Sequence, residues 1–154
     1  LYLGVGDRAL ALPTPEEAAN PDGSAASVVI GDCMVGDVLF VSRWDRSMRF
    51  HNTAHHQSLL IYKQVHPDPP FDARLRVFGD WDFNLRLFAA GVRAKRVERF
   101  QSYAEPDGTS SNPDLIEVRT VAQRHGGKWA GYVASARYRA FLTWRELRRR
   151  VGLC

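Results

Sequence analysis

Residues 79–91 read GDWDFNLRLFAAG and carry the clearest secondary-structure signal in this chain. Apolar side chains recur there at the spacing of one helical face, namely Trp81, Leu85 and Phe88. Asp82 and Arg86 stand four residues apart, as an ion pair on a helix does, and Gly91 supplies a stop signal. The stretch therefore predicts a helix over residues 80–90 that begins with the carboxylate of Asp80 directly after a loop.

Runs rich in Val, Ile and Phe around this helix predict strands over residues 27–30, 35–42 and 58–62. Residues 93–103 form a further extended segment, and residues 13–20 a short helix. Residues 1–5 resemble the end of a buried strand, which places Asp7 at that strand's C-terminal edge. Strands mixed with helices indicate an α/β fold, in which ligands bind beyond the C-terminal ends of strands.

Two segments between these elements lack a strand signal. Residues 43–52 are polar with isolated aromatic side chains, so we expect a mobile surface excursion there. Asn112 and Pro113 form a helix start signal, and the helix they begin is expected to run to Gly126 and Gly127. A last amphipathic helix is expected over residues 135–150.

Composition excludes several classes of protein. The chain has 154 residues, of which 45% are hydrophobic and 25% charged, which favours one globular domain. No stretch approaches the roughly 20 consecutive apolar residues that a membrane span needs. Cys33 and Cys154 are too few for a disulfide framework and lack the spacing of a zinc site, so we expect a reduced, cytoplasmic setting.

The basic charge of the chain is local. The net charge is +4, and residues 137–150 alone hold six Arg and one Glu. We therefore expect no nucleic-acid partner, because the rest of the chain carries no basic surface. The final helix places Tyr138, Phe141, Leu142 and Leu147 broadly on one side, which suits either peripheral contact with an anionic membrane or packing on its own domain.

Asp80 is the side chain best placed for chemistry. A carboxylate at a helix N-terminus beside a large aromatic residue can act as a general base. The alternative from the same residues is that Asp80 is a helix N-cap, with Asp82 as a first-turn acid. Trp81 fits either a stacking contact with a sugar ring or, more commonly, the core beneath the helix.

Six short motifs follow one another along the chain: Gly6-Asp7, Gly31-Asp32, His56-Gln57, Phe71-Asp72, Asp80-Trp81-Asp82 with Arg86, and Gly108-Thr109-Ser110-Ser111. Their order resembles that of inverting GT-A glycosyltransferases of the large family that includes polysaccharide and cell-wall sugar transferases. The chain resembles this family from about residue 1 to residue 126. The resemblance implies a Rossmann-like nucleotide-diphospho-sugar transferase fold with a mixed sheet and flanking helices.

The resemblance also implies roles for individual residues. Asp80 matches the family's catalytic base, which takes a proton from the acceptor hydroxyl as that oxygen attacks the anomeric carbon, with inversion. Asp7 matches the last acid of the metal motif, which binds Mg or Mn on the donor diphosphate. Further contacts to donor or acceptor are implied for Asp82, Trp81, His56, Gln57, Arg86, Ser110 and Ser111.

This mechanism makes a geometric demand, because one in-line displacement needs the base and the leaving-group clamp on opposite sides of one pocket. Asp7 and Asp80 are therefore expected to lie across a common site. His55 and His56 are adjacent in a predicted strand, so at most one of them is expected to face that site. The loop over residues 105–112 is either a lid over phosphates or sugars or a plain surface loop.

The expected function is transfer of a sugar from a nucleotide-diphosphate donor to a saccharide or lipid-linked acceptor at the inner face of the cell membrane. Family members begin with a strand-helix-strand unit that holds the nucleotide. Its absence before Leu1 leads us to expect an N-terminally truncated GT-A domain over residues 1–134, followed by the basic helix over residues 135–154. The alternative is a non-catalytic carbohydrate- or partner-binding module that retains the fold, which is favoured by Gly6 standing where a second acid is usual.

Overall fold

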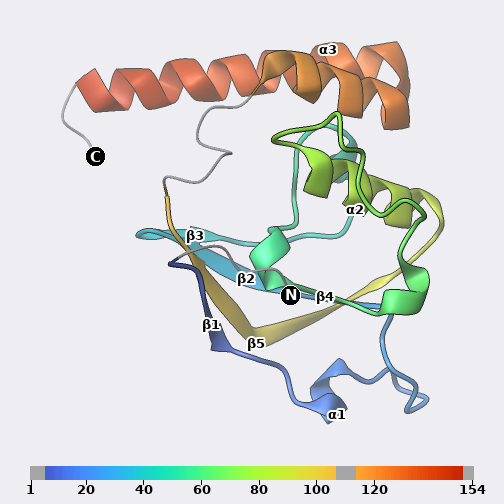
Figure 1. Cartoon of the computed structure of the whole chain (residues 1–154). Helices are drawn as coiled ribbons and strands as arrows, with labels where there is room; N and C mark the ends of the chain where they lie inside the picture. Colours follow the sequence, from blue (N-terminus) through green and yellow to red (C-terminus); the bar gives the residue numbers. More distant parts are fainter. Residues whose placement is uncertain (1–5, 107–113, 151–154) are drawn as a thin grey trace.

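The computed structural model describes residues 6–106 and 114–150, and Figure 1 shows the chain as a mixed α/β protein. A five-stranded mixed sheet has helices α2 and α3 above it in this view and the short helix α1 below it. The strands are β1 (Arg8–Ala11), β2 (Val28–Val35), β3 (Val38–Phe40), β4 (Leu59–Ile61) and β5 (Ala94–Ala104). The α/β class expected from the sequence is therefore confirmed.

Strand β2 is the centre of the sheet. It pairs in parallel with β5 along one side, and antiparallel with β4 and then β3 along the other. Strand β1 closes the far edge by pairing antiparallel with β5. Because β2 and β5 run the same way, their C-terminal ends, Val35 and Ala104, meet at one edge of the sheet.

The interruption expected at residues 31–34 is wrong, because β2 continues through them and the chain turns only after Val35. Gly31 was expected between two strands, but it lies inside β2 at a point where β2 approaches β5 closely. A Cβ atom at that position would lie 2.1 Å from the carbonyl oxygen of Phe100 in β5. Glycine is therefore needed to let the two strands pair at this point.

Alternating side chains of β2 supply both faces of the sheet with core residues. Val28 and Ile30 belong to the main core, which contains side chains of α2 and α3, whereas Val29 packs with Val97 and Phe100 on the other face. Trp81 of α2 and Val121 of α3 belong to this core and have no exposed surface. Helices α2 and α3 therefore cover one face of the sheet.

The helices begin and end at recognisable signals. Helix α1 (Pro15–Ala18) has a capping box between Thr14 and Glu17, and is shorter than the expected 13–20. Helix α2 (Gly79–Ala89) lies within one residue of its expected bounds. Helix α3 (Leu115–Arg150) breaks at Gly127, where φ is 76°. The helix resumes directly after that residue, so the expected start at residue 135 is wrong; the expected cap at Asn112 lies outside the described residues.

The segment over residues 43–52 is packed, which contradicts the expected mobile excursion. It contains the 3-10 turn η1 (Arg46–Arg49), whose Met48 is fully buried in the main core. The indole Nε1 of Trp81 donates a hydrogen bond of 2.7 Å to the Met48 carbonyl. The sequence does not predict this packing, because one buried methionine among polar neighbours produces no apolar periodicity.

Candidate functional site

Asp80 lies in the first turn of α2, but it is not the N-cap, a position that Phe78 occupies. Its Oδ1 atom accepts the backbone N–H of Trp81 at 2.8 Å. Its Oδ2 atom accepts a hydrogen bond of 3.0 Å from the side-chain amide of Asn52 and lies 3.4 Å from Nδ1 of His56. The carboxylate is thus held on one oxygen by the backbone and turned toward polar side chains on the other.

Asp7 lies just before β1, beside the C-terminal end of β5. The amide Nε2 of Gln57 donates to its Oδ2 atom at 2.8 Å, and the backbone N–H of Glu105 donates to its Oδ1 atom at 3.1 Å. Asp7 therefore sits at the sheet edge where β2 and β5 end. The strand expected before it falls on residues 1–5, outside the described part of the chain.

One short turn brings the two acids to the same region. In the 3-10 turn η2 (His56–Ser58), His56 contacts Asp80 while the next residue, Gln57, binds Asp7. The turn follows β3 and its connection and leads directly into β4, so the sheet fixes its position. Both carboxylates are therefore tied to consecutive residues of a single structural element.

The expectation that His55 and His56 point to opposite faces is wrong, because they enter a 3-10 turn and do not lie in a strand. Their rings stack with centroids 5.3 Å apart and planes at 12°, and the edge of His55 also meets Phe40. Burial, together with the charge on His56, lowers the pKa of His55 to about 4, although the negative charges of Asp80 and Asp7 oppose this shift. The His55 ring is thus neutral at pH 7.

Glu117 of α3 holds the chain just before α2 in place. Its buried carboxylate accepts the backbone N–H groups of Arg76, Val77 and Phe78 at 2.8, 2.9 and 3.1 Å. These donors precede the first turn of α2 and have no partner within that helix. Glu117 therefore fixes the approach to Asp80 from a distant part of the sequence.

Asp82 is structural, which corrects the contact with donor or acceptor expected for it. Its side chain is 1% exposed, and its Oδ1 atom lies 2.7 Å from Arg124 and 2.9 Å from His125, both in α3. Its Oδ2 atom lies 3.2 Å from Nε of Arg86. Arg86 is engaged as well, because it donates to the carbonyls of Pro69 and Pro70.

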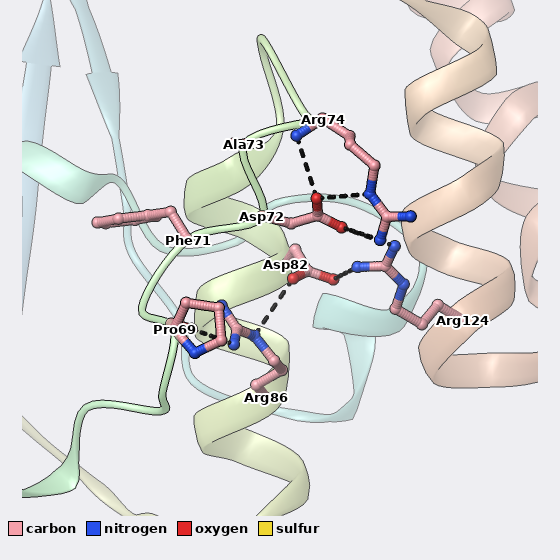
Figure 2. Close-up of a pocket in the computed structure, with 8 residues that line it drawn as sticks. All are labelled: Pro69, Phe71, Asp72, Ala73, Arg74, Asp82, Arg86 and Arg124. Atoms are coloured by element: carbon pink, nitrogen blue, oxygen red, sulfur yellow. Dashed lines mark hydrogen bonds and ion pairs between the residues drawn. The ribbon is translucent and has the colours of Figure 1, made fainter.

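Figure 2 shows a depression that is lined by Asp82, Arg86 and Arg124 together with Pro69, Phe71, Asp72, Ala73 and Arg74. Asp72 accepts hydrogen bonds from Arg74 and from Arg124, and the bonds from Arg74 lower the pKa of Asp72 well below its usual range. Each arginine of this cluster faces a carboxylate or a carbonyl. Three arginines and two aspartates therefore form a network of ion pairs that connects the start of α2 to α3.

Trp81 belongs to the core and cannot stack on a sugar, because it has no exposed surface and packs against Phe78 and Tyr138. Core packing was the commoner reading of its sequence context. Ser110 and Ser111 lie outside the described residues. Sequence reasoning missed Asn52 and Glu117, whose partners are 28 and 39 to 41 residues away and leave no local pattern.

A divalent cation would need oxygen atoms from a bound substrate, in addition to protein side chains, to bind beside Asp7. Among residues 6–106 and 114–150, no group of three His, Cys, Asp or Glu side chains could hold a metal ion. However, the side chain of Glu105 fills the space beside Gly6, where an added Cβ would meet its Cγ at 2.7 Å. Proteins usually bind Mg²⁺ through one or two carboxylates, and substrate phosphates complete its coordination. The carboxylates of Asp7 and Glu105 therefore suit a cation that binds together with a diphosphate.

No helix in the described part of the chain combines the length and apolar character required to cross a bilayer. Comparison of the chain with protein-family models, with curated proteins and with solved structures gave no match.

Proposed function

We propose that this chain is the acceptor-side part of an inverting GT-A glycosyltransferase, which moves a sugar from a nucleotide-diphosphate donor to a hydroxyl of a saccharide or lipid-linked acceptor. The observation that carries this proposal is the turn η2, whose consecutive residues His56 and Gln57 contact Asp80 and Asp7. Two acids that are far apart in the sequence therefore approach the same turn, which supports a site that uses both of them.

Asp80 serves as the general base in this proposal. The Trp81 N–H fixes one carboxylate oxygen, so the other oxygen can accept a proton from an acceptor hydroxyl without the side chain rotating. Asn52 and His56 hold that second oxygen on the polar side of the helix. Attack from this side, opposite the leaving group, inverts the anomeric carbon.

Asp7 serves at the leaving-group side. Bound Mg or Mn would neutralise charge that develops on the departing nucleotide diphosphate. Gln57 keeps the Asp7 carboxylate oriented from one side and the Glu105 backbone from the other. The sheet edge where β2 and β5 end thus forms the donor side of the site.

The test is sugar transfer and nucleotide-sugar hydrolysis by the protein with and without Mn²⁺, comparing Asp80→Asn with the wild type. Loss of a general base lowers turnover by about 10² to 10⁴-fold. Asp22→Asn is the matched control, because Asp22 lies in an exposed turn and bonds only locally in the interactions described, to Ser24. A folded Asp80→Asn protein with wild-type turnover would refute the assignment of the base.

The alternative function is a non-catalytic carbohydrate- or partner-binding module. It is favoured by Gly6, which replaces an acid, and by the lack of a three-residue metal cluster in the described residues. This alternative predicts nucleotide-sugar or saccharide binding without turnover, equally in the wild type and in Asp80→Asn. Calorimetric titration beside the turnover assay separates the two functions.

A further inference from the structure

The part of α3 after Gly127 exposes a row of apolar side chains. Trp129, Tyr132, Trp144 and Leu147 are 75%, 56%, 53% and 61% exposed. Ala136 and Ala140 are also exposed and continue the row at steps of three or four residues, which keeps all six on one side of a helix. We call this set the outer stripe; at 1.5 Å per residue it is about 27 Å long.

The outer stripe faces away from the domain. The opposite side of the same helix carries Ala130, Ala134 and Tyr138, of which the first two are buried and the third packs on Phe78 and Trp81. In Figure 1 this half of α3 runs along the top of the molecule and continues past the end of α2. The apolar side expected from the sequence is therefore wrong in including Tyr138, which is turned inward, whereas Phe141 and Leu147 are exposed.

Arginines border the outer stripe on both sides. Arg137 and Arg148 each follow a stripe residue by one position, so they lie about 100° around the helix from it on one side. Arg139 precedes a stripe residue by one position, so it lies about 100° away on the other side. The guanidinium of Arg148 lies 4.9 Å from the ring centre of Trp144. On the other half of α3, Arg119 lies 4.7 Å from the ring of Tyr132 and extends the basic border.

We propose that the outer stripe binds the surface of an anionic membrane, with α3 lying flat in the interface. An apolar row with two tryptophans and arginines beside it matches the chemistry of such a surface, where rings enter the headgroup boundary and cations meet lipid phosphates. A second copy of the chain is disfavoured, because pairing two outer stripes would bring the bordering arginines of both copies together. The inference goes beyond the proposed function and does not depend on it.

The first experiment measures binding of the whole chain to vesicles by tryptophan emission and by co-sedimentation. Vesicles of phosphatidylcholine mixed with phosphatidylglycerol are compared with phosphatidylcholine alone. We expect a blue shift of emission, quenched by brominated lipid chains, only with the anionic vesicles. Failure to bind anionic vesicles at low salt would overturn the proposal, and so would equal binding to neutral vesicles.

Paired substitutions then separate the two parts of the surface. Trp129→Ser with Trp144→Ser is expected to weaken binding at least about tenfold, whereas Ile116→Ser, an equally exposed apolar residue on the other half of α3, leaves it unchanged. Arg139→Gln with Arg148→Gln is expected to weaken binding about fivefold per arginine. Lys63→Gln is the matched control, because Lys63 is an exposed cation in the 3-10 turn η3 (Lys63–Val65), outside α3.

Two outcomes would identify a different occupant of the outer stripe, and a third would place membrane binding on another surface. Self-association that the tryptophan substitutions abolish, seen by sedimentation velocity, would assign the outer stripe to a second copy. Binding to duplex DNA that exceeds vesicle binding would assign the arginines to nucleic acid. Vesicle binding that is insensitive to the tryptophan pair would show that another surface carries it. Sugar transfer to a water-soluble acceptor tests the proposed function separately, because it needs no membrane.

Discussion

Replacing Glu117 should destabilise the protein more than any other change of a single acid on α3. The buried carboxylate receives three backbone N–H groups, and each hydrogen bond to a charged acceptor contributes about 1.5 kcal/mol. Glu117→Ala removes all three and leaves the donors without partners at the start of α2. We expect the free energy of unfolding to fall by about 4 kcal/mol, which is about 12 °C in melting temperature for a chain of this size.

Glu117→Gln provides the graded comparison, because its amide offers one acceptor oxygen where the carboxylate offers two. At least one N–H must then face an NH₂ group, so about half of the effect is expected. Urea denaturation followed by circular dichroism measures both variants. Glu146→Ala on the same helix is the control, since Glu146 makes a surface ion pair with Arg150 that contributes less than about 1 kcal/mol. A Glu117→Ala protein as stable as this control would refute the reasoning.

Three further predictions concern other parts of the fold. The pKa of His55 is about 4 in the folded protein and 6.5 in the unfolded chain, so the unfolded chain takes up a proton first as the pH falls. The free energy of unfolding should therefore decrease by about 3 kcal/mol between pH 6.5 and pH 4. Urea denaturation of His55→Phe should show a flatter pH dependence. Gly31→Ala should lower the melting temperature sharply because its Cβ would meet the Phe100 carbonyl, whereas Gly79→Ala, which meets only ordinary contacts, should not. Asp82→Asn should cost about 3 kcal/mol in thermal unfolding, because it removes the charge of a buried carboxylate that pairs with Arg86 and Arg124; unchanged stability would show that the pairs contribute nothing.

The sequence predicted elements well where a local pattern was strong. The bounds of α2 follow from the helical spacing of Trp81, Leu85 and Phe88 and from the stop at Gly91, and both signals act within one element. Strand β5 was found for a similar reason, as one extended run. Local patterns were also sufficient to identify the α/β class.

Errors arose where a residue serves a distant partner. Gly31 was placed between two expected strands because the contact that requires a glycine, with Phe100, is invisible in the local sequence. His55 and His56 were assigned to a strand because the 3-10 turn that stacks their rings has no apolar periodicity. Both errors come from inferring tertiary contacts from neighbours in the chain.

The candidate site shows the same division. Asp80 and Asp7 could be selected from the sequence because family-like motifs surround them, but the side chains that hold them could not. Asn52 and Glu105 approach these acids from segments 28 and 98 residues away. Their selection requires the fold, since neither belongs to a recognisable motif.

The turn η2 has a mechanical consequence for the two acids. Because His56 and Gln57 are covalent neighbours, a movement of this turn would carry the contacts of Asp80 and Asp7 in the same direction. The spacing between the two carboxylates then depends on the reach of two adjacent side chains and on the position of α2, which carries Asp80. A lengthening of that turn by one residue would change this spacing directly, even if every helix and strand kept its place.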